Sequence, residues 1–287
     1  MSKCLFVSDL HGNIEKYKKL FAYISETFPS AVFLGGDLLP SGIASLSSES
    51  AGRTEFLDHF LPSELSSLKI LLKNNYPRVF AILGNDDARI EESSVTKIAD
   101  SGLLEYVHFK KLKFDNYDIY GYSFVPPTPF LLKDWEKYDV SRYVDPGSIS
   151  PEEGIRSIEA SIHEKRYATI EEDLKNLAKF DDLGHSIFLF HSPPYDTVLD
   201  RAALDGKMID FVPLDIHVGS IAIKKFIETR QPLITLHGHV HESTSLTGQW
   251  RQQLGRTWSF NAAHSGKDLS VIIFDPENAL SAERLLI

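Results

Sequence analysis

The stretch PLITLHGHVH (residues 232–241) joins a short apolar run to three histidines within five residues. Imidazole is the commonest metal ligand in proteins, although a short histidine cluster can also be a solvated loop. The run before the histidines has the length and composition of a buried strand. The stretch therefore predicts a strand that ends in a candidate metal site, provided that other segments supply further ligands.

Apolar runs of the same kind recur along the chain. They are rich in β-branched and aromatic residues and do not alternate with polar residues, as expected of strands that are covered on both faces. The runs are CLFV (4–7), AVFL (31–34), VFAIL (79–83), SIFLF (186–190) and LSVIIF (269–274). Amphipathic helical patterns lie between them at 13–28, 54–75 and 218–229. This alternation predicts an α/β or mixed layered fold, with residues 1–287 forming a single domain.

The composition narrows the class of protein. The chain has 287 residues, of which 43% are hydrophobic, and a net charge of -10. A binder of nucleic acid or of anionic membranes is usually basic, so neither function is expected. Cys4 is the single cysteine, which excludes an intrachain disulfide, and its apolar surroundings predict a buried, inert thiol. No apolar run approaches the roughly 18 residues of a membrane span, and no signal peptide is evident, so we expect a cytoplasmic protein.

Two stretches interrupt the alternation of strands and helices. Residues 40–53 are rich in serine and glycine and are expected to form a mobile loop. Residues 126–150 carry prolines and aromatic residues ahead of a polar helical pattern at about 151–179. A long insertion of this kind is usually a lid or a binding loop. The alternative, a surface excursion that packs its own aromatic residues, remains open.

Candidate ligands follow five of the predicted strands. They are Asp9 and His11, Asp37, Asn85 and Asp86, His191, and His239 and His241. Functional groups gather at the carboxyl ends of strands in layered α/β sheets, so these side chains are expected to meet. Each residue alone could be a turn or cap residue. Turn chemistry does not readily account for the whole set.

The ligand types indicate the metals. Mixed carboxylate and imidazole ligands suit Mn, Fe, Zn or Ni better than Ca or Mg alone. Without Asp86, the remaining seven groups are still too many for one tetrahedral ion but suit two ions that share a carboxylate. Two ions about 3.5–4 Å apart can hold the attacking and the leaving oxygen of a phosphoryl displacement. A structural zinc site is excluded by ligand type, because such sites favour several cysteines.

This ordered set resembles the calcineurin-like metallophosphoesterase family, whose pattern is D-x-H, G-D, G-N-H-[DE], H and G-H-x-H. The matching residues are DLH (9–11), GD (36–37), GND (84–86), His191 and GHVH (238–241). The resemblance implies two stacked mixed β-sheets flanked by helices. It also implies a phosphoester hydrolase in which a hydroxide that bridges two metals attacks phosphorus in line.

The resemblance further implies a role for each matching residue. Asp9, His11 and His241 would bind the first metal; Asn85, His191 and His239 would bind the second; and Asp37 would bridge them. The candidate catalytic residues are Asp9, Asp37, Asn85 and Asp86. His237 falls outside the pattern and is expected to support the strand end or a ligand.

Asp86 departs from the family pattern, which has a histidine at this position. That histidine typically contacts the phosphate and assists the leaving group. Its absence favours a phosphodiesterase over a phosphomonoesterase, with His217 or His264 as alternative proton donors or structural residues. The expected partner is a small phosphoester, and a nuclease is disfavoured by the net charge. The alternative function is a non-catalytic, metal-binding scaffold of the same fold that serves in protein interactions.

Overall fold

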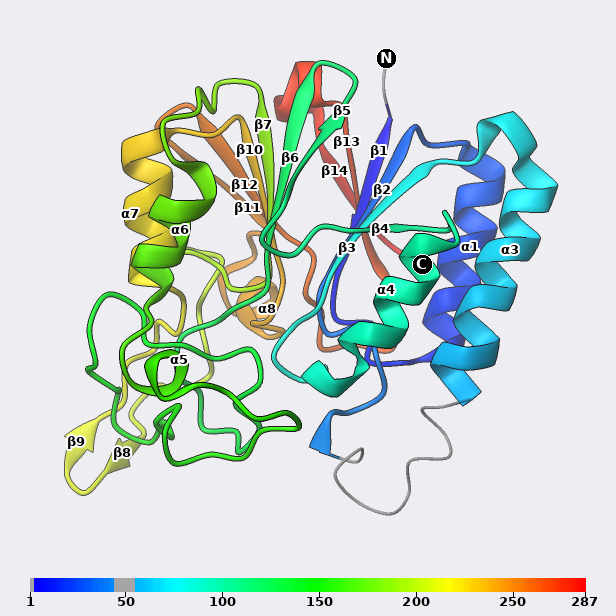
Figure 1. Cartoon of the computed structure of the whole chain (residues 1–287). Helices are drawn as coiled ribbons and strands as arrows, with labels where there is room; N and C mark the ends of the chain where they lie inside the picture. Colours follow the sequence, from blue (N-terminus) through cyan, green and yellow to red (C-terminus); the bar gives the residue numbers. More distant parts are fainter. Residues whose placement is uncertain (1–2, 44–54) are drawn as a thin grey trace.

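A computed structural model describes residues 3–43 and 55–287 of the chain (Figure 1). Two six-stranded sheets stack against each other, and helices cover their outer faces. This is the layered fold that the alternation of strands and helices predicts. Most of the loop expected at 40–53 lies outside the described residues.

The first sheet has the order β14-β13-β1-β2-β3-β4. Strands β1 to β4 are parallel; β13 pairs antiparallel with β1, and β14 pairs antiparallel with β13. The bounds are β1 Cys4–Val7, β2 Ala31–Gly35, β3 Arg78–Ile82, β4 Glu105–Tyr106, β13 Ser270–Phe274 and β14 Glu283–Leu286. Figure 1 shows the flanking helices on its outer face: α1 (Ile14–Thr27), α3 (Leu61–Leu72) and α4 (Glu92–Asp100).

The second sheet has the order β11-β12-β10-β7-β6-β5. The four central strands are parallel, and β5 and β11 are antiparallel edges. The bounds are β5 Lys111–Phe114, β6 Tyr117–Tyr122, β7 Ser186–Phe190, β10 Ile234–His237, β11 Arg251–Leu254 and β12 Thr257–Asn261. Helices α6 (Ile170–Ala178) and α7 (Ile221–Arg230) cover it. Shorter elements are α5 (Ile162–Arg166), α8 (Ser243–Thr247) and the hairpin β8 (Met208–Ile209) and β9 (Val212–Pro213).

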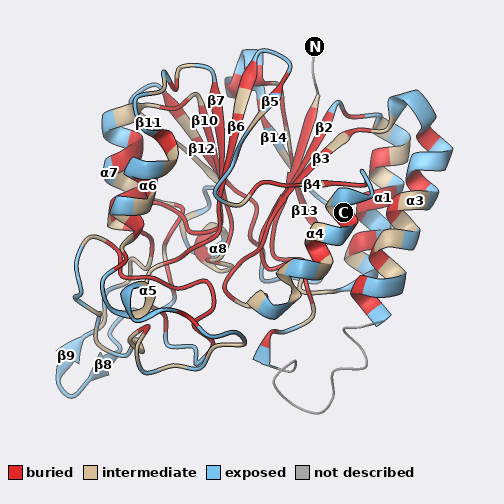
Figure 2. Ribbon diagram, viewed as in Figure 1, coloured by how far each residue is buried: buried red, intermediate tan, exposed pale blue. Residues whose placement is uncertain are grey.

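The apolar runs do not alternate because both faces of each sheet are buried, as Figure 2 shows. In β1, Cys4 and Phe6 pack in the core between the sheets, whereas Leu5 and Val7 pack beneath the helices. The Cys4 thiol is fully buried, as expected, and burial raises its pKa. Among the described residues, no helix is long and apolar enough to cross a lipid bilayer.

Two predicted helices differ from the structure in detail. The pattern at 54–75 divides into a π-helical turn (Phe56–Phe60), α3 and a 3-10 turn (Lys73–Asn75). The continuous helix predicted at 151–179 is wrong, because only α5 and α6 form within it. The Ile155 backbone instead donates to Leu131 and accepts from Lys133, so this segment pairs with the 126–150 insertion rather than with its own preceding turn.

Candidate metal centre

The loops that follow β1 and β2 lie side by side at the carboxyl ends of the strands. The Asp9 amide donates to the Gly36 carbonyl at 3.0 Å, and the His11 amide donates to the Asp37 carbonyl at 2.8 Å. Both carboxylates are almost completely buried. The paired loops therefore bring three of the predicted ligands to one place.

The backbone at this place is strained. Asp9, His11, Asp37 and His239 have φ angles of 59°, 47°, 50° and 70°. This left-handed region is unfavourable for residues that carry a Cβ, at a cost of about 1–3 kcal/mol each, and such residues cluster at functional sites. The surrounding hydrogen bonds hold the four residues in it.

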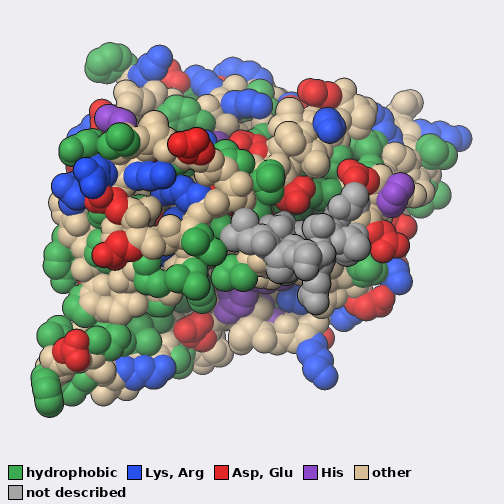
Figure 3. Space-filling view, turned by 60° about the horizontal axis from the view of Figure 1, so that its bottom comes forward, with side chains coloured by type: hydrophobic (Ala, Val, Ile, Leu, Met, Phe, Trp, Pro, Cys, Tyr) green, Lys and Arg blue, Asp and Glu red, His purple; other side chains and the backbone are tan. Residues whose placement is uncertain are grey.

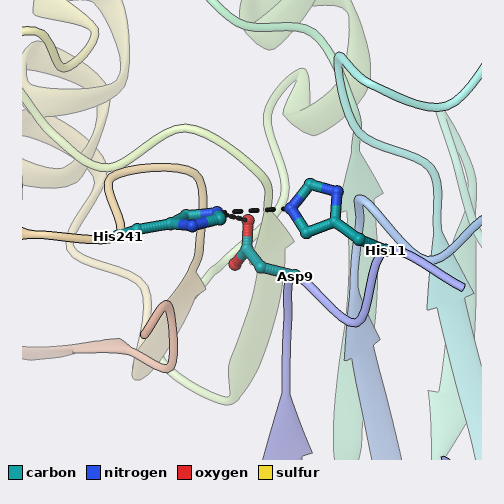
Figure 4. A group of neighbouring side chains, drawn as sticks. All are labelled: Asp9, His11 and His241. Carbon is teal, nitrogen blue, oxygen red and sulfur yellow. Dashed lines mark hydrogen bonds and ion pairs between the residues drawn. The ribbon is translucent and has the colours of Figure 1, made fainter. Parts of the chain in front are cut away.

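Asp9, His11 and His241 form one cluster, which we term the outer group. Each offers a ligand atom, and these atoms lie within 4.8 Å of one another. The His241 Nε2 atom is 3.1 Å from Asp9 Oδ1 and 3.4 Å from His11 Nε2. Figure 4 shows that the two imidazole rings approach Asp9 from opposite sides.

Asp37, His191 and His239 form a second cluster with the same spacing, which we term the inner group. The His191 Nε2 atom lies 3.3 Å from Asp37 Oδ2 and 3.1 Å from Asn85 Oδ1. Asn85 thus lies beside the inner group. The same Asp37 oxygen is 4.0 Å from His11 Nε2, so this carboxylate lies between the two groups.

One histidine in each group is held by its other ring nitrogen. The Nδ1 atom of His191 is 2.8 Å from the Gly35 carbonyl, and that of His11 is 3.1 Å from Asp86 Oδ2. Both partners accept, so each Nδ1 carries a proton, and each Nε2 faces the other members of its group, where it could bind a metal ion. Metal-binding histidines are usually oriented in this way.

The charges of the cluster fit cations. In the described part of the chain, the ion-pair partners of Asp9 and Asp37 are all histidines. Burial acts to lower the pKa of His191, but the Asp37 and Asp9 carboxylates outweigh it and raise that pKa to about 9. Burial also acts to lower the pKa of His11, but the Asp86 and Asp37 carboxylates outweigh it and raise that pKa to about 9. Metal ions would compensate the same buried carboxylates.

Two glycines of the motifs allow this close packing. A Cβ atom at Gly84 would lie 2.3 Å from Asp37 Oδ1 and 2.6 Å from His191 Nε2. A Cβ atom at Gly238 would lie 2.6 Å from Asp9 Oδ2. Any side chain at these positions would therefore displace a candidate ligand.

The cluster opens into a cavity of about 440 Å³. Its lining residues are His11, Asp37, Ser41, Ile43, Asn85, Asp86, Phe130, Leu132, His239, His241 and Glu242. Figure 3 shows histidine side chains in a hollow on this face of the molecule. The cavity gives a small molecule access to both groups.

The remaining predicted residues lie in different surroundings. Asp86 faces the cavity and contacts His11. His237 is fully buried and hydrogen-bonds to the Ser192 carbonyl and the Thr235 hydroxyl, and burial lowers its pKa to about 3. His217 lines a neighbouring cavity, whereas His264 is not among the residues that line either one.

Sequence reasoning missed Asp87. Its buried carboxylate accepts from the amides of Leu38, Leu39 and Gly84 and so ties the loop after β2 to the loop after β3. Burial and the nearby Asp37 raise the pKa of Asp87 to about 7. The available signal was the second of two consecutive acids in GNDD, directly after a strand. Ser41 and Glu242 were also missed as cavity residues, and no pattern marks them.

Comparisons with known proteins concern the family and the fold of the chain. The family model for calcineurin-like phosphoesterases matches residues 2–243. The chain resembles the structure of TT1561 of Thermus thermophilus with 18% identity, a TM-score of 0.57 and coverage of 99% of this chain and 98% of that one. It resembles a dimetal phosphatase from Danio rerio with 11% identity, a TM-score of 0.52 and the same coverage. These two likenesses concern the fold. A search of curated proteins found no match.

Proposed function

We propose that this chain, which belongs to the calcineurin-like phosphoesterase family, cleaves phosphodiesters in preference to phosphomonoesters. Membership of the family makes it a phosphoric ester hydrolase with a dinuclear metal centre. The observation that carries this preference is the Asp86 carboxylate, which faces the cavity where the family has a histidine. The substrate is a small phosphoester, since the net charge of -10 disfavours nucleic acid.

We assign one metal to the outer group and one to the inner group together with Asn85, with Asp37 bridging them. The distances of 3.3 and 4.0 Å from one Asp37 oxygen to a histidine of each group support this assignment. The oxygen and nitrogen ligands favour Mn, Fe, Zn or Ni. Two such ions would polarise the phosphoryl oxygens and lower the pKa of a water molecule.

The charge of the cavity favours a monoanionic substrate. Asp37, Asp86 and Glu242 line it, and no Lys or Arg is among its described lining residues. A phosphomonoester carries up to two negative charges at neutral pH, because its second pKa is about 6, whereas a diester carries one. Repulsion by the Asp86 carboxylate is therefore weaker for the diester.

Asp86 acts as a positioning residue. Its carboxylate accepts from the His11 Nδ1–H, the Ser41 hydroxyl and the Gly42 amide. These bonds fix the orientation of the His11 ring within the outer group. An acceptor in this position cannot donate a proton to a departing alkoxide. Esters with acidic leaving groups therefore suit this site best.

The 126–150 insertion covers the site in this proposal. Phe130 and Leu132 line the cavity of about 440 Å³ beside the two groups, which we term the metal-side cavity, together with His11 and His239. These two apolar side chains would limit the access of bulk water to a bound phosphoester.

The test compares bis(4-nitrophenyl) phosphate with 4-nitrophenyl phosphate on Mn-loaded enzyme. Both release 4-nitrophenolate, so leaving-group acidity is matched and charge differs. We expect a higher kcat/KM for the diester. A higher kcat/KM for the monoester would overturn the proposal.

Asp86→His tests the leaving-group argument. General acid assistance is worth about 10²–10⁴-fold, so the variant should raise the alkyl-to-aryl ratio of turnover. Asp86→Asn is the matched control, because it removes the charge without adding an acid, and it should leave this ratio unchanged. An equal rise in both variants would show that the imidazole is irrelevant to the leaving group.

A further inference from the structure

A second cavity of about 460 Å³ adjoins the metal-side cavity. The two share Phe130, His239 and Glu242 as lining residues. Its other walls come from the insertion at 126–129 and 145–148 and from the segment 202–219 that carries β8 and β9. A group bonded to a phosphorus atom at the metals can therefore extend into this space.

The walls of the second cavity are mostly apolar. They include four prolines and the side chains of Leu204, Ile209 and Leu214. Three carboxylates, two histidines (His217 and His239) and two hydroxyl groups also line it, but no Lys or Arg is among its described lining residues. Such a surface favours burial of an apolar group and repels an anionic one.

The wall built by the insertion is fixed from within. Lys133 and Glu136 form a fully buried ion pair, and Lys133 also donates to the Thr128 carbonyl. Asp139 accepts from the Ser220 hydroxyl and the Ile221 amide at the start of α7. The Lys133 bonds hold the insertion internally, and the Asp139 bonds tie it to the start of α7.

The opposite wall is fixed by Asp200, which is fully buried. Its carboxylate accepts from the amides of Asp196, Thr197 and Gly219, and His217 Nδ1 lies 2.8 Å from it. Because both walls are held by internal hydrogen bonds, the space between them is a built cavity with a defined shape.

We propose that the second cavity binds one ester group of the phosphodiester substrate, and that this group is a ring-sized, apolar alcohol residue without a second negative charge. The inference rests on the proposed phosphodiesterase activity and adds the substrate class. A 460 Å³ cavity lies within the size range of small-ligand sites.

The kinetic test uses three diesters that share 4-nitrophenolate as the leaving group and differ in the other ester group: methyl, phenyl or 4-carboxyphenyl. Burial of the phenyl ring should raise kcat/KM by roughly tenfold over methyl. The carboxylate should cancel this gain. Equal kcat/KM for methyl and phenyl esters, with diester hydrolysis intact, would overturn the subsite but not the phosphodiesterase.

Leu214→Arg and Ile209→Arg place a cation in this cavity, since both residues line it and neither lines the metal-side cavity. Each should abolish the phenyl advantage over methyl and raise kcat/KM for the 4-carboxyphenyl ester relative to the methyl ester. Leu280→Arg is the matched control, because Leu280 is exposed and lines neither cavity. A change in the order of the three kcat/KM values in Leu280→Arg would contradict the assignment of the subsite to this cavity.

A binding measurement decides the matter independently of turnover. Methylphenylphosphinate and dimethylphosphinate are monoanions without an ester bond, so neither is hydrolysed. Calorimetry on Mn-loaded wild-type protein should show about tenfold tighter binding of the phenyl compound, and Leu214→Arg should remove the difference. Equal affinities in the wild type would refute the subsite even if the enzyme proved to prefer monoesters.

Discussion

The inner and outer groups contain the same kinds of ligand but are supported differently. His191 of the inner group is fully buried, and a main-chain carbonyl, that of Gly35, holds its ring. His11 of the outer group has a side chain that is 32% exposed, and the Asp86 side chain holds its ring. Substitution cannot remove a main-chain anchor, but it can remove a carboxylate. The outer group is therefore the half of the centre that sequence change can tune, and we expect its ion to exchange more readily.

The largest effect is expected from Asp37→Ala, which removes the carboxylate that lies between the groups. Metal content after Mn reloading should fall from near two ions per chain to below one, and hydrolysis should fall to background. Elemental analysis measures the content, with the exposed Asp268→Ala as control. Two retained ions in Asp37→Ala would refute the bridge, and a wild-type content below one would refute the dinuclear assignment.

The next effect is the pH dependence of metal loading. Protonated histidine cannot bind a metal, so the apparent affinity for metal falls as the pH drops below the pKa of about 9 of His11 and His191. The affinity falls by about tenfold per pH unit for each proton that the metal displaces. The outer group contains a second histidine with a raised pKa, because Asp9 raises the pKa of His241 against the effect of burial. In the inner group, burial and His191 lower the pKa of His239 to about 4.

The outer ion should therefore lose affinity more steeply with acid than the inner ion. His191→Ala isolates the outer group and His11→Ala isolates the inner group, so Mn titrations of each variant between pH 6 and 9 compare the slopes. A steeper slope for the inner group would contradict the charge assignment.

Asp86→Asn sharpens the comparison between the two anchors. The amide is a weaker acceptor for the His11 Nδ1–H, and loss of such a partner typically lowers metal affinity about 10–100-fold. The outer ion should weaken and the inner ion should not, as measured by stepwise chelator titration. Equal weakening of both ions would show that Asp86 acts on the whole centre.

The smallest effect on metal binding is expected from His237→Phe. His237 belongs to the HGHVH stretch but lies outside both groups, and its ring stacks on Phe190. The substitution leaves the Ser192 carbonyl without its side-chain partner, at a cost of about 1–3 kcal/mol of stability, whereas the Thr235 hydroxyl keeps its bond to Ser259. Denaturant unfolding should detect the loss while the metal content stays unchanged. A loss of metal would mean that His237 positions a ligand.

The strand ends were predictable because each carries two local signals at once. A run such as SIFLF predicts a buried strand, and a polar residue directly after it, His191, lies at the carboxyl end of that strand. Parallel strands then bring these ends together without any knowledge of the connections. Local signals of this kind do not identify the role of Asp86, because that role depends on contact with His11, which lies 75 positions away in the sequence.

The insertion was the least predictable part of the fold. Lys133 and Glu136 have side chains that normally face water, yet both are fully buried because they neutralise each other. Ile155 bonds to this segment instead of extending a helix. Such choices depend on partners distant in sequence and leave no periodicity to follow.

The left-handed backbone at Asp9, His11, Asp37 and His239 bears on how this chain is maintained by selection. Glycine adopts that conformation freely, whereas each side chain present here bears a cost in backbone strain. The two aspartates also bury charges whose ion-pair partners among the described residues are histidines. A chain with no use for metal would have no reason to keep this combination at four positions, so its presence argues for selection for metal binding. It favours a working hydrolase over an interaction scaffold of the same fold.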